Sequence, residues 1–94
     1  MRLNPDSARL QQALGQEYAI QEKYDMALTA YQRAAQFDPM LPEVHLARAV
    51  ILLELKRFGE ALAEIHLEQE LVPESRAAVE TRARIEAAMA ASSP

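Results

Sequence analysis

The chain has no cysteine, no tryptophan and only two glycines among its 94 residues. Without cysteine it forms no disulfide, binds no metal through thiolates and has no thiol nucleophile, but a cysteine-free chain survives in any redox environment, so the compartment stays open. Long apolar runs are also lacking, because the segment Ala49 to Leu53 is far shorter than the roughly 20 residues of a membrane helix. The first residues lack the charged-then-apolar pattern of a signal peptide. We therefore expect a soluble protein without membrane insertion, cytoplasmic by default.

Charge of one sign is not concentrated in any stretch. Ten basic and fourteen acidic residues give a formal net charge of −4, and no block of lysine and arginine is long enough to follow a phosphate backbone. Only 5% of the residues are aromatic, and helix packing accounts for them, which leaves no platform for stacking bases. The sequence therefore predicts no nucleic-acid ligand.

Patterns typical of enzymes and metal sites are missing as well. No glycine-rich phosphate loop, nucleophile elbow or His-Glu-x-x-His run occurs. His66 and Glu70 are four residues apart and offer two ligands, which is too few for a strong site. Glu64 and Glu68 share a helix face roughly opposite His66, and we interpret Glu64 as a surface charge. We therefore predict that the protein is not an enzyme, with no catalytic residue, no cofactor and no metal site.

What the chain does contain is a helical composition and a period. Alanine and leucine are prominent, and Pro5, Pro39 and Pro73 recur with a constant 34-residue spacing. Proline is tolerated at helix boundaries but not in helix interiors, so regular prolines indicate a repeated unit. A 34-residue shift of the chain against itself aligns similar residues: Gly15 with Ala49 and Ala83, Tyr24 with Phe58, Ala27 with Ala61, Leu28 with Leu62, and Tyr31 with Ile65.

Each repeated unit contains two helical segments. In the first unit, residues 3–39, we expect Asp6 or Ser7 to cap a helix that ends near Ile20, and Asp25 to cap a second helix that ends near Phe37. In the second unit, residues 40–73, we expect helices over about 41–55 and 59–71. A fifth helix over about 74–91 is more polar, as a terminal helix of an array must be. The last residues, 92–94, are expected to fray.

The first unit carries Leu14-Gly15, Tyr18, Ala27, Tyr31, Ala34 and Pro39, which closely resembles the tetratricopeptide repeat (TPR) pattern with its 34-residue period. The leading tryptophan of that pattern is replaced by Gln11. The resemblance implies one all-α domain over residues 1–94, a right-handed solenoid of helical hairpins with a C-terminal capping helix. In such a hairpin Gly15 and Ala27 allow close approach of the helices, while Tyr18, Tyr24 and Tyr31 fill the space between them.

The second unit departs from the pattern at two packing positions. Arg48 stands where the first unit has Leu14, and Glu68 stands where it has Ala34. One hypothesis is that Arg48 and Glu68 pair across the helix interface. The alternative is that both are exposed at a less well-packed end of the array.

The start of the chain matches the close of a unit, because Leu3-Asn4-Pro5 aligns with Leu71-Val72-Pro73. We therefore expect an excerpt of a longer array or protein. The outer face of the first helix, with Leu10, Leu14 and Tyr18, would then be partly exposed and is a candidate self-association face.

The resemblance also implies a concave groove, lined by the first helix of each pair, that binds a peptide or helix of another protein. The central helix is apolar nearly all round. If Val44, Ala49, Leu52 and Leu55 pack on neighbouring helices, then Leu46, Val50 and Leu53 remain for the groove. The predicted groove residues are Gln12, Gln16, Ile20, Leu46, Val50, Leu53, Glu80 and Arg84.

From this groove we expect a non-catalytic protein-interaction module that binds a partner peptide or amphipathic helix. The alternative is a structural segment that oligomerises or joins domains through the exposed face of the first helix. Co-chaperone TPR domains hold a peptide carboxylate with lysine and asparagine, but the matching places here carry Gln12, Gln16 and Ala47, so a carboxylate clamp is not expected. Short TPR chaperones of bacterial secretion systems, which shield an apolar helix, suit the apolar groove better, by analogy of fold.

Overall fold

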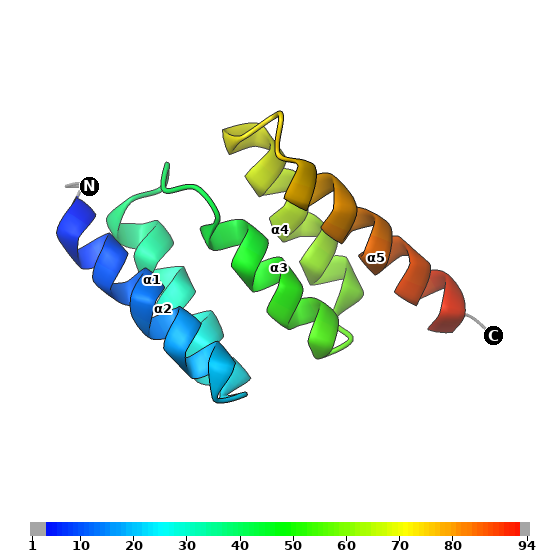
Figure 1. The fold of residues 1–94 in the computed structure, drawn as a ribbon, viewed down its shortest axis with the longest axis horizontal. Helices are drawn as coiled ribbons and strands as arrows, with labels where there is room; N and C mark the ends of the chain where they lie inside the picture. Colours follow the sequence, from blue (N-terminus) through cyan, green and yellow to red (C-terminus); the bar gives the residue numbers. More distant parts are fainter. Residues whose placement is uncertain (1–3, 93–94) are drawn as a thin grey trace. The chain divides into compact units, whose positions relative to one another are not determined.

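The computed structural model describes residues 4–92, which form five α-helices joined by short turns (Figure 1). The helices are α1 (Pro5–Ile20), α2 (Tyr24–Phe37), α3 (Val44–Glu54), α4 (Phe58–Leu71) and α5 (Arg76–Ser92). None of these described helices is long and apolar enough to cross a membrane. Leu3 and the last two residues of the expected frayed tail lie outside the described part.

By its internal contacts the chain divides into two compact units at the peptide between Val44 and His45. The first unit contains the α1–α2 hairpin. The second contains α3 from His45 onward, together with α4 and α5.

The 34-residue period reappears in the backbone of the two hairpin turns. Glu22 and Lys56, which occupy equivalent places in the two units, both have a φ of 60° in the turns that follow α1 and α3. In the first turn the Lys23 amide donates to the Tyr18 carbonyl at 2.9 Å, and in the second the Arg57 amide donates to the Leu52 carbonyl at 2.8 Å. Both are the six-residue closure of a Schellman motif, in which a left-handed residue satisfies the last carbonyls of a helix.

The helix starts differ from the predicted caps. Asn4 caps α1, because its Oδ1 accepts a hydrogen bond from the Ser7 amide at 3.2 Å, so the prediction of Asp6 or Ser7 as the cap was wrong. Proline is pre-organised for the first helical position, which places the cap one residue earlier, at Asn4. Helix α2 starts at Tyr24 with no side-chain cap. Asp25 therefore lies in the first turn of α2, where the positive end of the helix dipole stabilises its carboxylate.

Two further helices begin later than the sequence predicted. Helix α3 begins at Val44 rather than near residue 41, because Glu43 has a φ of 76°, outside the helical region. Helix α5 begins at Arg76 rather than near residue 74. The Ser75 Oγ accepts a hydrogen bond from the Ala78 amide at 3.1 Å and so closes the first turn of α5.

The α1–α2 hairpin is held by a close approach at Gly15. A Cβ at this position would lie 2.9 Å from two atoms of the Tyr31 ring, closer than carbon atoms pack. Tyr31 is buried, and Ala27 and Ala34 beside it on α2 have no exposed surface. The predicted role of Gly15 and Ala27 as small residues at the helix crossing is consistent with this packing.

Hairpin α3–α4 is held partly by polar contacts. The Glu64 carboxylate of α4 accepts a hydrogen bond from Arg48 Nη1 at 2.7 Å and lies 2.6 Å from His45 Nδ1. One turn further along, the Glu68 carboxylate accepts a hydrogen bond from the Leu46 amide at 3.2 Å. Glu64 is 9% exposed and Glu68 only 1%, so these two carboxylates are part of the core of the second unit.

The predicted pairing of Arg48 with Glu68 was therefore wrong, because Arg48 pairs with Glu64 instead. The alternative, that Arg48 and Glu68 are both exposed, was also wrong, since Glu68 is buried and Arg48 is partly buried. The interpretation of Glu64 as a surface charge was wrong for the same reason. The helical period placed Glu64 and Glu68 on one face correctly, but nothing in the sequence showed that this face turns toward α3.

The two glycines offer a matched test of the close approach. We expect Gly15→Ala to lower the free energy of unfolding by about 1 kcal/mol, because overpacking against Tyr31 outweighs the gain of about 1 kcal/mol in helix propensity. A Cβ at Gly59 in α4 would have nothing within 4 Å, so Gly59→Ala should be neutral or slightly stabilising. Urea unfolding followed by circular dichroism measures both, and a more stable Gly15→Ala protein would contradict the packing described.

The polar cluster predicts coupling between Arg48 and Glu64. We expect Glu64→Leu alone to cost about 2–3 kcal/mol, because it leaves the partly buried guanidinium and imidazole without their shared acceptor. The double variant Arg48→Leu/Glu64→Leu should cost less than the sum of the single changes by about 1–2 kcal/mol. Urea unfolding of the four proteins gives the coupling. Additive effects at these two positions would show that the ion pair does not contribute.

Candidate functional site

The predicted apolar stripe lies on α3 in the second unit. Three of the four residues assigned to the packing face of this helix are fully buried, namely Val44, Ala49 and Leu52. Leu46, Val50 and Leu53 are only partly buried. They follow one another at intervals of four and three residues, which places them on one side of the helix. The second unit therefore presents a continuous, partly exposed apolar stripe, called the α3 stripe below.

The contacts on α4 determine which way α3 faces. Because His45, Leu46 and Arg48 bind the carboxylates of Glu64 and Glu68, the helix cannot rotate about its axis without breaking them. Ile51 is also buried, at 4% exposure, a position that sequence reasoning did not assign to the packing face. The sequence did contain a signal for the burial of Ile51, because apolar residues cover a wider part of α3 than one neighbouring helix can bury.

Glu80 and Arg84 supply the polar part of the predicted groove from α5. Both side chains are exposed and lie four residues apart, on one side of the helix. Three residues of α5 are buried instead, and these are Ala78, Thr81 and Ile85. The helix therefore has an inner apolar face and an exposed face that carries Glu80 and Arg84.

In the first unit the predicted groove residues lie on α1. Gln12 is partly buried, and its Nε2 donates a hydrogen bond to the Pro42 carbonyl at 3.4 Å. Gln16 is exposed, and Ile20 is 70% exposed at the end of the helix. Gln12 therefore has a structural role in holding the segment after α2, while Ile20 is a large apolar side chain left in solvent.

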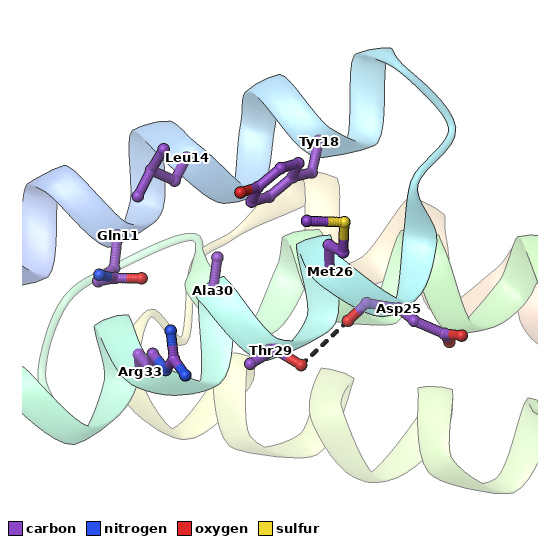
Figure 2. Close-up of a pocket in the computed structure, with 8 residues that line it drawn as sticks. All are labelled: Gln11, Leu14, Tyr18, Asp25, Met26, Thr29, Ala30 and Arg33. Atoms are coloured by element: carbon purple, nitrogen blue, oxygen red, sulfur yellow. Dashed lines mark hydrogen bonds between the residues drawn. The ribbon is translucent and has the colours of Figure 1, made fainter.

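A hollow of about 280 Å³ lies between α1 and α2 in the first unit. Figure 2 shows Leu14 and Tyr18 reaching from α1 toward Met26 and Ala30 on α2. Its eight lining residues are Gln11, Leu14, Tyr18, Asp25, Met26, Thr29, Ala30 and Arg33. The candidate self-association face borders this hollow: Leu14 and Tyr18 line it, and Leu10, one turn earlier on α1, is 60% exposed.

Among the described residues, Tyr31 and Glu60 have shifted pKa values. Burial raises the pKa of the Tyr31 hydroxyl, because the charged phenolate is disfavoured away from water. The Arg57 guanidinium donates two hydrogen bonds to Glu60, at 2.5 and 2.8 Å, and holds the pKa of that carboxyl below its usual value. Both shifts have a structural explanation.

The residues considered for metal binding do not come together in a site. His66 Nε2 lies 3.1 Å from the Glu70 carboxylate, and both side chains are exposed on α4. Within residues 4–92, no group of three or more histidine or acidic side chains is arranged to hold a metal ion.

Comparison with known proteins matches these hairpins to a repeat family. The family model described as TPR repeat matches residues 15–56. In a structural comparison, the first TPR of Spaghetti (RPAP3), bound to the HSP90 peptide SRMEEVD, has a TM-score of 0.90 and 26% sequence identity. The match covers 95% of this chain and 71% of that one. Residues 15–56 thus match the TPR repeat family, and the chain has the fold of a TPR protein.

The TPR assignment confirms the fold class predicted from the 34-residue period, all-α helical hairpins with a further helix at the C-terminal end. A search of curated proteins finds no match to the sequence. Sequence reasoning missed two features of the structure, namely the contacts that Glu64 and Glu68 of α4 make with α3 and the residues of α2 that line the hollow. The second had a readable signal, because Asp25, Met26, Thr29 and Arg33 recur at helical spacing.

Proposed function

We propose that this TPR protein is a non-catalytic interaction module that binds an apolar, amphipathic helix or peptide of another protein. The α3 stripe carries the proposal, because Leu46, Val50 and Leu53 remain partly exposed on a helix whose other side is packed. Glu80 and Arg84 on the exposed side of α5 would contact polar groups of the ligand. The other predicted groove residues, Gln12, Gln16 and Ile20, lie on α1 in the first unit, and their part in binding stays a prediction from the TPR pattern.

The energetics of the α3 stripe favour an apolar ligand. Burying one leucine or valine side chain fully contributes about 1.5–3 kcal/mol, and these three residues retain part of that surface. The polar contacts to Glu64 and Glu68 hold α3 in one orientation, so little ordering is needed when a ligand binds. A pre-organised surface loses less entropy on binding than a flexible one.

The ligand of the similar TPR domain offers a contrast. That domain is bound to the HSP90 peptide SRMEEVD, which is acidic. The positions expected to hold a peptide carboxylate carry Gln12, Gln16 and Ala47 here, with no cation among them. Gln12 is also engaged by the Pro42 carbonyl. We therefore propose binding of a peptide through apolar side chains, and not through its C-terminal carboxylate.

Two peptides distinguish these modes by isothermal titration calorimetry. The first is a synthetic amphipathic helix of about 16 residues, long enough for four turns, with leucine on one face and glutamine and serine on the other. The second is SRMEEVD. We expect saturable binding of the amphipathic helix and none of SRMEEVD. Binding of SRMEEVD alone would contradict the proposal and indicate a carboxylate site.

Substitution on the α3 stripe locates the site. Val50→Glu should weaken binding of the amphipathic helix at least about 10-fold, because it places a charge where an apolar side chain of the ligand packs. Ala63→Glu, an exposed change on α4, is the matched control and should leave affinity unchanged. Circular dichroism checks that both variants fold. Equal affinity of a folded Val50→Glu protein would show that the stripe is not the site.

A further inference from the structure

We propose that the α1–α2 face pairs two copies of this chain about a twofold axis. The surface consists of the hollow between the two helices and its rim, called the α1–α2 face below. It belongs to the first unit alone and shares no residue with the α3 stripe. Two observations on this face indicate a second copy as the occupant.

The first observation is the apolar character of the face. Leu10 is 60% exposed, Met26 48% and Leu14 37%, and all three surround or line the hollow. Large exposed apolar side chains grouped around a concave surface indicate an interaction site. Methionine is flexible and adapts to irregular gaps, so Met26 of each copy is suited to fill space in the other.

The second observation is the placement of two opposite charges at the ends of the hollow. Figure 2 shows Asp25 at one end and Arg33 at the other, with Thr29 between them on α2. Neither charge makes an ion pair with any of the residues 4–92. Asp25 and Arg33 are eight residues apart, which corresponds to about 12 Å along a helix.

This placement is self-complementary. Thr29 is the midpoint between Asp25 and Arg33, so a twofold axis near Thr29 sets the two α2 helices antiparallel. Asp25 of one copy then faces the second copy's arginine at position 33, and Arg33 faces the second copy's aspartate at position 25. A surface that pairs with itself through charges carries opposite signs on the two sides of its axis, and this face does so. An unrelated partner would need no such symmetry.

Sedimentation velocity over a wide concentration range tests for the pairing. We expect the natural chain to pass from monomer to dimer with increasing concentration, in the micromolar to millimolar range typical of small interfaces. Asp25→Arg and Arg33→Asp should each raise the dimer dissociation constant about 10-fold or more, because each puts like charges in contact at both ends of the interface. A chain that stays monomeric throughout would overturn the proposal.

Mixing the two variants gives the sharper result. The first variant carries arginine at both positions 25 and 33, and the second carries aspartate at both, so opposite charges meet at both ends of a mixed pair. The equimolar mixture should therefore dimerise at least as well as the natural chain.

The controls for this experiment are Glu74→Arg and Arg76→Asp, which change net charge equally at exposed positions near the start of α5. They should not affect association. Failure of the mixture to restore dimerisation, or equal effects of the controls, would overturn the twofold arrangement. Loss of dimerisation in Val50→Glu would also overturn it, because the contact would then lie on α3.

Discussion

The fold depends on how closely the two helices of a hairpin approach each other. In the first hairpin the approach is permitted by the absence of a side chain at Gly15, where a Cβ would meet the Tyr31 ring at 2.9 Å. The equivalent positions in the second hairpin carry Ala49 and Ile65, both buried. A larger residue on one helix is matched by a smaller one on the other, so the core volume is similar in both hairpins.

The second hairpin adds charge to this packing. Glu68 occupies the place that Ala34 has in the first hairpin, and it is buried with a hydrogen bond from the Leu46 amide. Glu64, one turn earlier, binds Arg48 and His45. Buried carboxylates are unfavourable unless hydrogen bonds satisfy them, and directional contacts of this kind allow only one rotation of α3 on α4. The fixed rotation of α3 on α4 therefore places the polar contacts in the core and leaves the α3 stripe partly exposed.

The elements were predictable from the sequence, whereas several details were not. The spacing of Pro5, Pro39 and Pro73 was sufficient for the hairpins, because a 34-residue repeat reflects a repeated packing unit. The buried side of α3 also followed from periodicity. The cap of α1 did not follow from the sequence, because Asn4, Asp6 and Ser7 are all good capping residues. Asn4 is the cap because Pro5 occupies the first position of the helix. The partner of Arg48 could not be predicted either. A shift of one turn between α3 and α4 decides which carboxylate of α4 the guanidinium reaches. That shift depends on packing across the whole hairpin.

Methyl-resolved NMR tests most directly the claim that the protein carries two separate interaction faces. Leucine, valine and methionine methyl signals report on both faces in one spectrum. We expect the amphipathic helix peptide to shift signals of Leu46, Val50 and Leu53, and dilution of the free protein to shift those of Leu10, Leu14 and Met26. Peptide-induced shifts confined to the α1–α2 face, with the α3 stripe unchanged, would contradict the account.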